Sequence, residues 1–170
     1  MQAIKLFKCC KDYDIEDFLH NKAIDFINRD ICRVYLILNE EEFDKGNIKI
    51  EAYFTLSMRA LCFEDDVSKT TIKKITGFKD REMSEFVLLG QLGKHIEKKD
   101  NGTVNQSGIN LNSILDYAFE VINSINEWIP CNAVLIECSE IIHNKGIYQN
   151  EGFSLLQVDR GFYQYYKKIT

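Results

Sequence analysis

Apolar and polar positions alternate along this chain in patterns that predict a succession of helices and strands. Apolar residues recur at helical spacing between Asp14 and Asn28, and Asp14 is placed to cap that helix. The apolar run Arg33 to Leu38 and the alternating stretch Ile48 to Ser57 predict two strands. Because only an acidic loop separates these strands, we expect them to pair as an antiparallel hairpin.

A strand, a polar loop and a long helix follow one another in the middle of the chain. The continuous apolar run Phe86 to Leu92 suits a strand buried on both faces, and helical spacing returns from Leu111 to Ile125. The loop between them carries Gly102 and Gly108. Free N–H groups and the positive end of the dipole at a helix start favour an anion such as phosphate. An ordinary strand-to-helix connection is the alternative.

The remaining segments complete a mixed α/β pattern. Residues 62–85 contain a short helix ended by Gly77, and the polar residues around it predict an exposed connection. A buried strand, a short helix and a terminal hairpin with an Asp159-Arg160-Gly161 turn follow; they are expected at 133–138, 140–150, 153–158 and 162–168. This order predicts one α/β domain over residues 1–170, with parallel and antiparallel strand pairs.

Composition narrows the class of protein. At 170 residues and 45% apolar residues the chain can bury a core, and no apolar run is long enough for a membrane span or a secretory signal. We therefore expect a cytoplasmic protein. Six cysteines without any Cys-x-x-Cys pair predict reduced thiols and no metal site. The net charge of −5 argues against a broad nucleic-acid surface, although a local basic patch is compatible with it.

Three motifs in this order resemble the GNAT family, the GCN5-related N-acetyltransferases. Asn105 to Asn110, NQSGIN, follows the strand VLLGQLGK and stands where the family has its pyrophosphate loop. Ile147 to Phe153, IYQNEGF, resembles the family's Phe-Tyr-x-x-x-Gly-Phe, and Tyr165 to Lys168, YYKK, resembles its last strand. The resemblance covers nearly the whole chain and is strongest to small stand-alone bacterial and phage members. It implies a central, mixed and strongly twisted sheet flanked by helices.

The resemblance also implies an activity. The chain would transfer an acetyl group from acetyl-CoA to a primary amine of a small molecule, a protein or an aminoacyl-tRNA, directly within a ternary complex. Two groups of cofactor-binding residues follow: Leu92, Gly93 and Lys94 for the pantetheine arm, and Asn105, Gln106, Ser107, Gly108, Ile109 and Asn110 for the pyrophosphate. Asn105 and Asn110 depart from the family's usual residues. An inactive GNAT-fold module that binds acyl-CoA or a partner protein is therefore the alternative.

Two residues are the catalytic candidates. By the resemblance, Tyr148 is the general acid that protonates the leaving thiolate. Glu137 is a polar residue inside an otherwise apolar strand, which makes it a candidate general base. Glu51, His95, His143 and a water-mediated base remain open, whereas Cys138 lacks an evident base and is expected to be a buried structural thiol. The acceptor and a homodimeric state are also left open.

Overall fold

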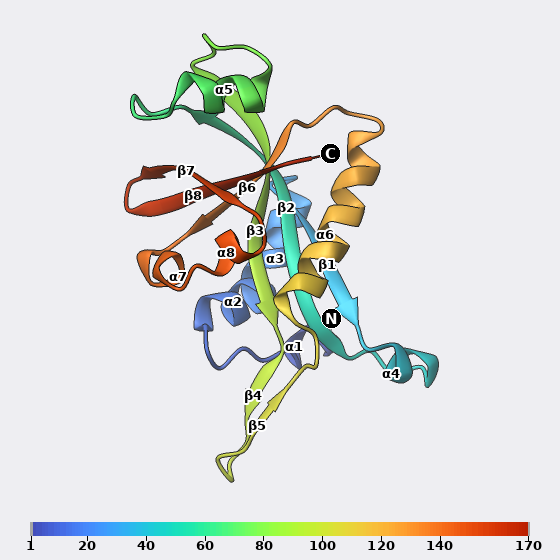
Figure 1. Ribbon diagram of the computed structural model, residues 1–170. Helices are drawn as coiled ribbons and strands as arrows, with labels where there is room; N and C mark the ends of the chain where they lie inside the picture. The colour runs from blue at the N-terminus through green and yellow to red at the C-terminus, as the bar shows by residue number, and fades with distance from the viewer. Residues whose placement is uncertain (1, 170) are drawn as a thin grey trace. The chain divides into compact units, whose positions relative to one another are not determined.

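The computed structural model of the protein describes residues 2–169 (Figure 1). These residues form two compact units. Unit 1 comprises the residues up to Leu56 together with Gln91–Ala118, and unit 2 comprises Ser57–Gly90 together with the residues from Phe119 onward. None of the helices described is long and apolar enough to cross a membrane. The assignment of residues 1–170 to a single domain stays a prediction.

Six strands are joined in one mixed sheet, and their bounds are β1 Arg33–Leu38, β2 Ile50–Cys62, β3 Met83–Lys94, β6 Ala133–Cys138, β7 Ser154–Asp159 and β8 Phe162–Lys168. Their order is β1-β2-β3-β6-β8-β7. The pairs β1–β2, β6–β8 and β7–β8 are antiparallel, whereas β3–β6 is parallel. The predicted mixed α/β fold and both predicted hairpins are confirmed.

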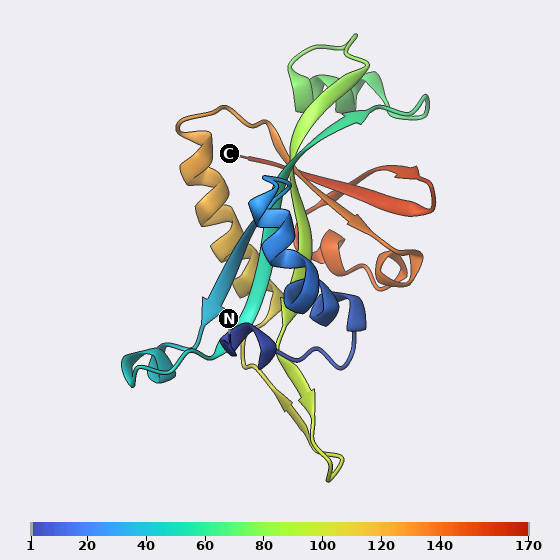
Figure 2. The same ribbon diagram turned by 180° about the vertical axis from the view of Figure 1, so that it is seen from behind.

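The N-terminal helix of unit 1 begins two residues earlier than predicted. It runs without a break through α2 (Tyr13–Asp17), the π-helical turn η1 (Phe18–Lys22) and α3 (Ala23–Asn28) (Figure 2). Asp12 and not Asp14 is the N-cap, because the Asp12 carboxylate accepts the N–H groups of Asp14 and Ile15. The helix buries Phe18 and Leu19 against a core that also contains Phe7, Ile50 and Tyr53.

Two connections of unit 1 contain regular structure where only loops were predicted. The acidic segment after β1 forms α4 (Glu40–Asp44), capped by the Asn39 side chain, which accepts the Glu42 N–H at 2.9 Å. The segment after β3 folds into a hairpin of β4 (Ile96–Lys98) and β5 (Val104–Gln106). A further short helix, α1 (Gln2–Lys5), precedes α2. The long helix predicted from Leu111 onward is confirmed as α6 (Leu111–Asn126).

Unit 2 places its helices as the pattern indicated, with one interruption. The helix α5 (Lys69–Thr76) ends at Gly77, whose φ is +83°, and buries Ile72 and Ile75 beside Phe86. The prediction of a single helix at 140–150 is wrong, because the segment forms two short helices, α7 (Glu140–Asn144) and α8 (Ile147–Asn150). Gly146 separates them: its φ of +63° is left-handed, and this conformation ends the first helix.

Candidate active site

The two central strands of unit 2 part after a short parallel pairing. Val87 pairs with Val134 and Leu88 with Leu135, and no further pair joins them in the described chain, although both strands continue. Strand β6 is meanwhile paired with β8 along its whole length. The backbone edge of β6 turned away from β8 therefore has no strand partner over residues 136–138. An unpaired strand edge offers N–H and C=O groups to another molecule.

In unit 1, the loop that opens α6 keeps several backbone N–H groups free. The Asn110 side chain caps the helix by accepting the Ser113 N–H at 2.8 Å. Two further loop N–H groups are used, because Ser107 donates to the His95 carbonyl and Ile109 donates to the Ser107 hydroxyl. Within residues 2–169, no hydrogen bond is recorded for the N–H groups of residues 108, 110, 111 and 112.

Lys94 adds a positive charge to this loop. Its ammonium donates to the Ile109 carbonyl at 2.9 Å, so the side chain of a β3 residue holds the segment just before α6. The first turn of α6 carries no acidic residue. The free N–H groups, the helix dipole and Lys94 together make this end of α6 favourable for an anion.

The glycines Gly93 and Gly108 are explained differently. A Cβ at Gly93 would clash with Ile15 Cγ2 and lie 2.8 Å from Tyr53 Cε1, so close approach of the chain itself requires glycine there. At Gly108 a Cβ would meet nothing within 4 Å, and the residue is not among those with positive φ. The fold of the described residues thus requires glycine at 93 but not at 108.

Two predicted loop residues lie elsewhere. Asn105 and Gln106 were assigned to the pyrophosphate loop, but they belong to strand β5, where they pair with Glu97 and Ile96. The loop assignment is wrong for these two residues because the segment before the helix is long enough to form the β4–β5 hairpin. Both are exposed, and a contact with a cofactor would come from the strand. Leu92 lies half-buried in β3.

Tyr148 in unit 2 carries a hydroxyl without a recorded partner. Its ring packs against Phe153 and Tyr165, with ring centroids 6.1 Å away in each case. Among residues 2–169 no hydrogen bond is recorded for its hydroxyl, in contrast to Tyr165, whose hydroxyl binds His143 Nδ1 and Gln149 Nε2. Burial raises the pKa of Tyr148 to about 12. Tyr148 is therefore protonated at neutral pH, as a proton donor must be.

Glu137 lies on the other face of β6 from Tyr148. Its strand neighbour Cys138 belongs to the Tyr148 side, where this thiol contributes to the raised pKa of the tyrosine. Glu137 Oε1 accepts a hydrogen bond from Gln164 Nε2 at 2.7 Å and lies 4.0 Å from Arg59 Nη2. Gln164 is fully buried, and its Oε1 has no hydrogen-bond partner in the described chain. Such an unpaired buried acceptor costs about 1–3 kcal/mol of folding free energy.

Each of the other candidate bases makes contacts of its own, as Glu137 does. His95 Nδ1 accepts the Lys8 N–H at 3.1 Å, so a neutral His95 carries its proton on Nε2 and neither nitrogen is a free acceptor. Burial also lowers the pKa of His95, which favours this neutral form. Glu51 accepts a hydrogen bond from Asn39 Nδ2 at 2.8 Å. His143 is stacked on Tyr163 with ring centroids 3.8 Å apart.

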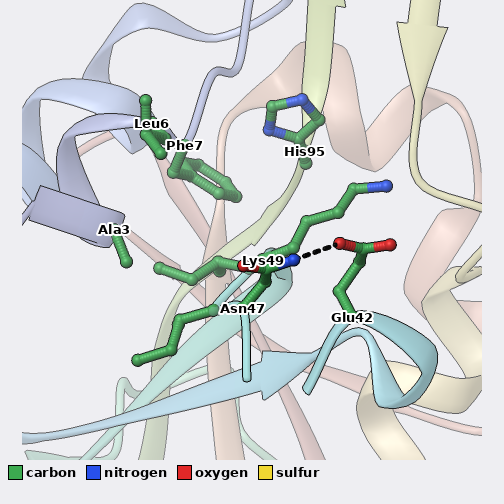
Figure 3. A pocket seen from close by; sticks show the side chains of 9 residues that line it. Ala3, Leu6, Phe7, Glu42, Asn47, Lys49 and His95 are labelled. Atoms are coloured by element: carbon green, nitrogen blue, oxygen red, sulfur yellow. Dashed lines mark hydrogen bonds between the residues drawn. The ribbon is translucent and has the colours of Figure 1, made fainter. Parts of the chain in front are cut away.

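His95 also lines a pocket of about 580 Å³ in unit 1 (Figure 3). Phe7 and Ile50 form its buried apolar wall, and Lys49 and Glu42 lie at its polar side. The Glu42 carboxylate already accepts hydrogen bonds from Lys45 and Asn47. None of the residues predicted to bind the cofactor lines this pocket.

Cys138 is a buried thiol, as expected. All six cysteines are free, and burial raises the pKa of Cys138, which makes it a poor nucleophile. No group of three or more potential metal ligands occurs in the part of the chain that the structure describes.

No protein-family model and no curated protein sequence matches the chain, whereas solved structures do. A tyrosine-to-phenylalanine mutant of KacT matches with a TM-score of 0.68 and 19% identity, over 98% of this chain and 87% of KacT. AtaT complexed with acetyl-methionyl-tRNAfMet matches with a TM-score of 0.69 and 20% identity, over 97% and 86%. Both neighbours are GNAT-fold proteins. The chain has a GNAT fold.

A third solved structure, AtaTR bound with acetyl-CoA, matches with a TM-score of 0.65 and 19% identity, over 98% of this chain and 86% of that one. The GNAT fold predicted from the three motifs is thus confirmed. The sequence reasoning did not single out Gln164, the buried residue that contacts the candidate base Glu137. Its only signal was an amide within the aromatic strand FYQYYKK, which in isolation does not separate a buried position from an exposed one.

Proposed function

We propose that the protein is an N-acetyltransferase that moves the acetyl group of acetyl-CoA to a primary amine by direct transfer in a ternary complex. The observation that carries the proposal is the parting of β3 and β6 after two residue pairs, which leaves the edge of β6 at 136–138 free. A strand edge of this kind can hydrogen-bond the amide groups of a pantetheine arm. The structural neighbour AtaTR was solved bound with acetyl-CoA, which supports the same cofactor here.

The cofactor phosphates are assigned to the start of α6. The free N–H groups of Gly108 and Asn110, those of residues 111 and 112, and the Lys94 ammonium would bind the pyrophosphate, with Ser107 and Ile109 shaping the loop. The open space at Gly108 suits close approach of a phosphate to the backbone. Leu92 and Gly93 would contribute backbone groups to the pantetheine arm, while Asn105 and Gln106 would contribute at most strand side chains.

The chemistry requires three proton transfers. Glu137 would take a proton from the acceptor ammonium, and the freed nitrogen lone pair would attack the thioester carbonyl carbon. As the C–S bond breaks, the sulfur takes the electron pair and receives the Tyr148 hydroxyl proton. The nitrogen then carries one proton more than a neutral amide, and this proton would pass to the Tyr148 phenolate and restore the hydroxyl. The unpaired hydroxyl of Tyr148 and its pKa of about 12 support the assignment of the acid, because the group keeps its proton until the thiolate forms.

The acceptor is proposed as a primary amine, and an aminoacyl-tRNA is the class that a neighbour favours, since AtaT was solved with acetyl-methionyl-tRNAfMet. The net charge of −5 favours a local contact with such a nucleic acid over a broad one. AtaT was also solved with the C-terminus of the antitoxin AtaR, so a protein partner of that kind is a further proposal. A homodimer and a cytoplasmic location stay predictions.

Two measurements test the proposal in sequence. Binding to the folded state alone raises the melting temperature, so thermal-shift titrations with acetyl-CoA and CoA should show a concentration-dependent increase. CoA release should then be followed with a panel of amines that includes charged tRNA. A shift without CoA release for any amine would favour the alternative, an inactive module that binds acyl-CoA. No shift at millimolar concentration of either ligand would end the assignment.

A further inference from the structure

Two buried glutamines of unit 2 face each other across β7 and β8 but are held by different partners. Gln157 is bonded at both ends of its amide, because Nε2 donates to the Cys62 carbonyl and Oε1 accepts the Glu64 N–H, each at 3.0 Å. Gln164, its partner in the strand register, donates from Nε2 to Glu137 and leaves Oε1 unpaired among residues 2–169. The first amide ties two backbone groups together, whereas the second contacts only a carboxylate.

Folding stability does not explain why residue 164 is a glutamine. A fully buried carbonyl oxygen without a donor lowers the stability of the fold, and an apolar side chain of similar size would remove that cost. Glu137 does not need Gln164 to stabilise a charged carboxylate. Its side chain is 27% exposed, and the Arg59 guanidinium lies 4.0 Å from the same oxygen. The amide at 164 is thus present although it lowers the stability of the fold.

The contact does fix the orientation of the Glu137 carboxylate. Gln164 and Arg59 both lie at Oε1, and no partner is recorded for Oε2 in residues 2–169. Glu137 also belongs to the stretch of β6 whose second edge is unpaired. A buried, short amide hydrogen bond on one oxygen turns the other oxygen in a defined direction.

We propose that Gln164 is a positioning residue that holds Glu137 so that its Oε2 receives the proton of the acceptor ammonium. This inference rests on the proposed function, and it names a residue that the sequence motifs do not include. In the step that it serves, the N–H bond of the ammonium breaks, the proton passes to Oε2, and the nitrogen keeps the electron pair for attack on the thioester.

The experiment compares Gln164→Met with the matched variant Gln157→Met. For Gln164→Met we expect a melting temperature that is unchanged or higher by about 2–4 °C, because the unpaired oxygen is gone. We expect kcat to fall about tenfold or more while KM for acetyl-CoA changes little.

Gln157→Met should show the opposite pattern. Its loss leaves the Cys62 carbonyl and the Glu64 N–H without their partner, so the melting temperature should fall by several degrees while kcat is unchanged. The double variant Glu137→Gln with Gln164→Met should be no slower than Glu137→Gln alone, because the two residues act as one unit.

Three outcomes would overturn the inference. If Gln164→Met destabilises the protein as much as Gln157→Met does, the Gln164 amide stabilises the fold and is not a positioning group. If Gln164→Met has the same kcat as the active wild-type protein, Glu137 needs no orientation by Gln164. A wild-type protein that binds acetyl-CoA but releases no CoA with any amine would refute the proposed function itself, and positioning for transfer would fall with it. The stability comparison can be read in all three cases.

Discussion

The loop before α6 in unit 1 and the end of β6 in unit 2 both carry candidate site residues, but the chain uses their polar groups differently. In the loop, several polar groups are paired with one another: Ser107 holds Ile109, Asn110 holds Ser113, and Lys94 holds the Ile109 carbonyl. These bonds leave the N–H groups of residues 108, 110, 111 and 112 without a recorded partner in residues 2–169. At the end of β6, Glu137 Oε2 and Gln164 Oε1 are left without recorded partners in the described residues. The loop is ordered by its own bonds, whereas the strand end retains unused acceptors.

Under the proposed function, this difference separates cofactor binding at the loop from proton transfer at the end of β6. A preformed loop offers N–H groups at fixed positions, so a cofactor can bind there without an ordering cost. Unused polar groups lower stability, and they are retained where a reaction requires them. We therefore expect changes at the strand end to alter turnover more than stability, and changes in the loop to alter stability and cofactor affinity more than turnover.

Tyr148→Phe gives the largest expected effect. The substitution removes only a hydroxyl that has no recorded hydrogen bond, so packing against Phe153 and Tyr165 should persist. If the hydroxyl protonates the thiolate, kcat should fall by ~10²-fold or more, with little change in acetyl-CoA affinity. Steady-state kinetics with an accepted amine and binding titrations measure the two quantities. Tyr165→Phe is the comparison, and an unchanged kcat in Tyr148→Phe would assign a packing role to this residue.

The paired substitutions Gly93→Ala and Gly108→Ala separate the two glycines. Because a Cβ at 93 would clash with Ile15 Cγ2, we expect Gly93→Ala to destabilise the protein by about 1–3 kcal/mol. Gly108→Ala should leave the free energy of unfolding within about 0.5 kcal/mol of the wild-type value. It should nevertheless weaken acetyl-CoA binding, which thermal-shift titration measures. Equal affinity in Gly108→Ala and wild type would place the phosphates elsewhere.

Two substitutions at Asn110 separate its role as the cap of α6 from anion binding at the start of that helix. Asn110→Ala removes the bond to the Ser113 N–H and should cost about 1 kcal/mol in urea unfolding. Asn110→Asp keeps a capping oxygen, so stability should be retained, but its negative charge should weaken acetyl-CoA binding. If both variants bind acetyl-CoA as tightly as the wild type, the start of α6 does not hold the pyrophosphate.

The smallest expected effect is a change in alkaline stability. The pKa of Tyr148 is about 12 in the folded protein and about 10 when unfolded. The unfolded state therefore loses its proton first, and the stability linked to Tyr148 is present below pH 10 and is lost as pH rises towards 12. Tyr148→Phe should flatten this decline in urea midpoints, although Tyr53, whose pKa burial also raises, still contributes. An identical slope in both proteins would contradict the burial of the hydroxyl.

Much of the fold was readable from the sequence because burial and hydrophobic period coincide there. The strand at 133–138 is an uninterrupted apolar run, and the structure buries Ala133 to Ile136 almost completely. The cap at Asp12 and the break at Gly146 were missed because neighbouring residues offered equally good signals. Asp14 also suits a cap, and glycine within a helical stretch does not always end it.

The site was less predictable because its geometry depends on long-range contacts. No local pattern shows that Glu137 lies opposite Gln164, since the two residues are brought together only by the register of β6 and β8. The β4–β5 hairpin was hidden for the same reason, because KHIEKKDNGTVNQ carries few apolar residues to mark its strands. Motif positions located the region, and strand pairing decided which residues meet.

The π-helical turn η1 bears on how this chain tolerates changes in length. The Ala23 N–H bonds the Phe18 carbonyl five residues back, so this turn holds one residue more than an α-helical turn. Deletion of a residue within the turn, such as Asn21, can be absorbed by conversion to ordinary helix, with Ile15 and Phe26 still facing the core. The same deletion inside α6 would rotate all later residues by ~100° and expose Ile122. The N-terminal helix thus contains a site where a single-codon deletion can leave the hydrophobic face intact.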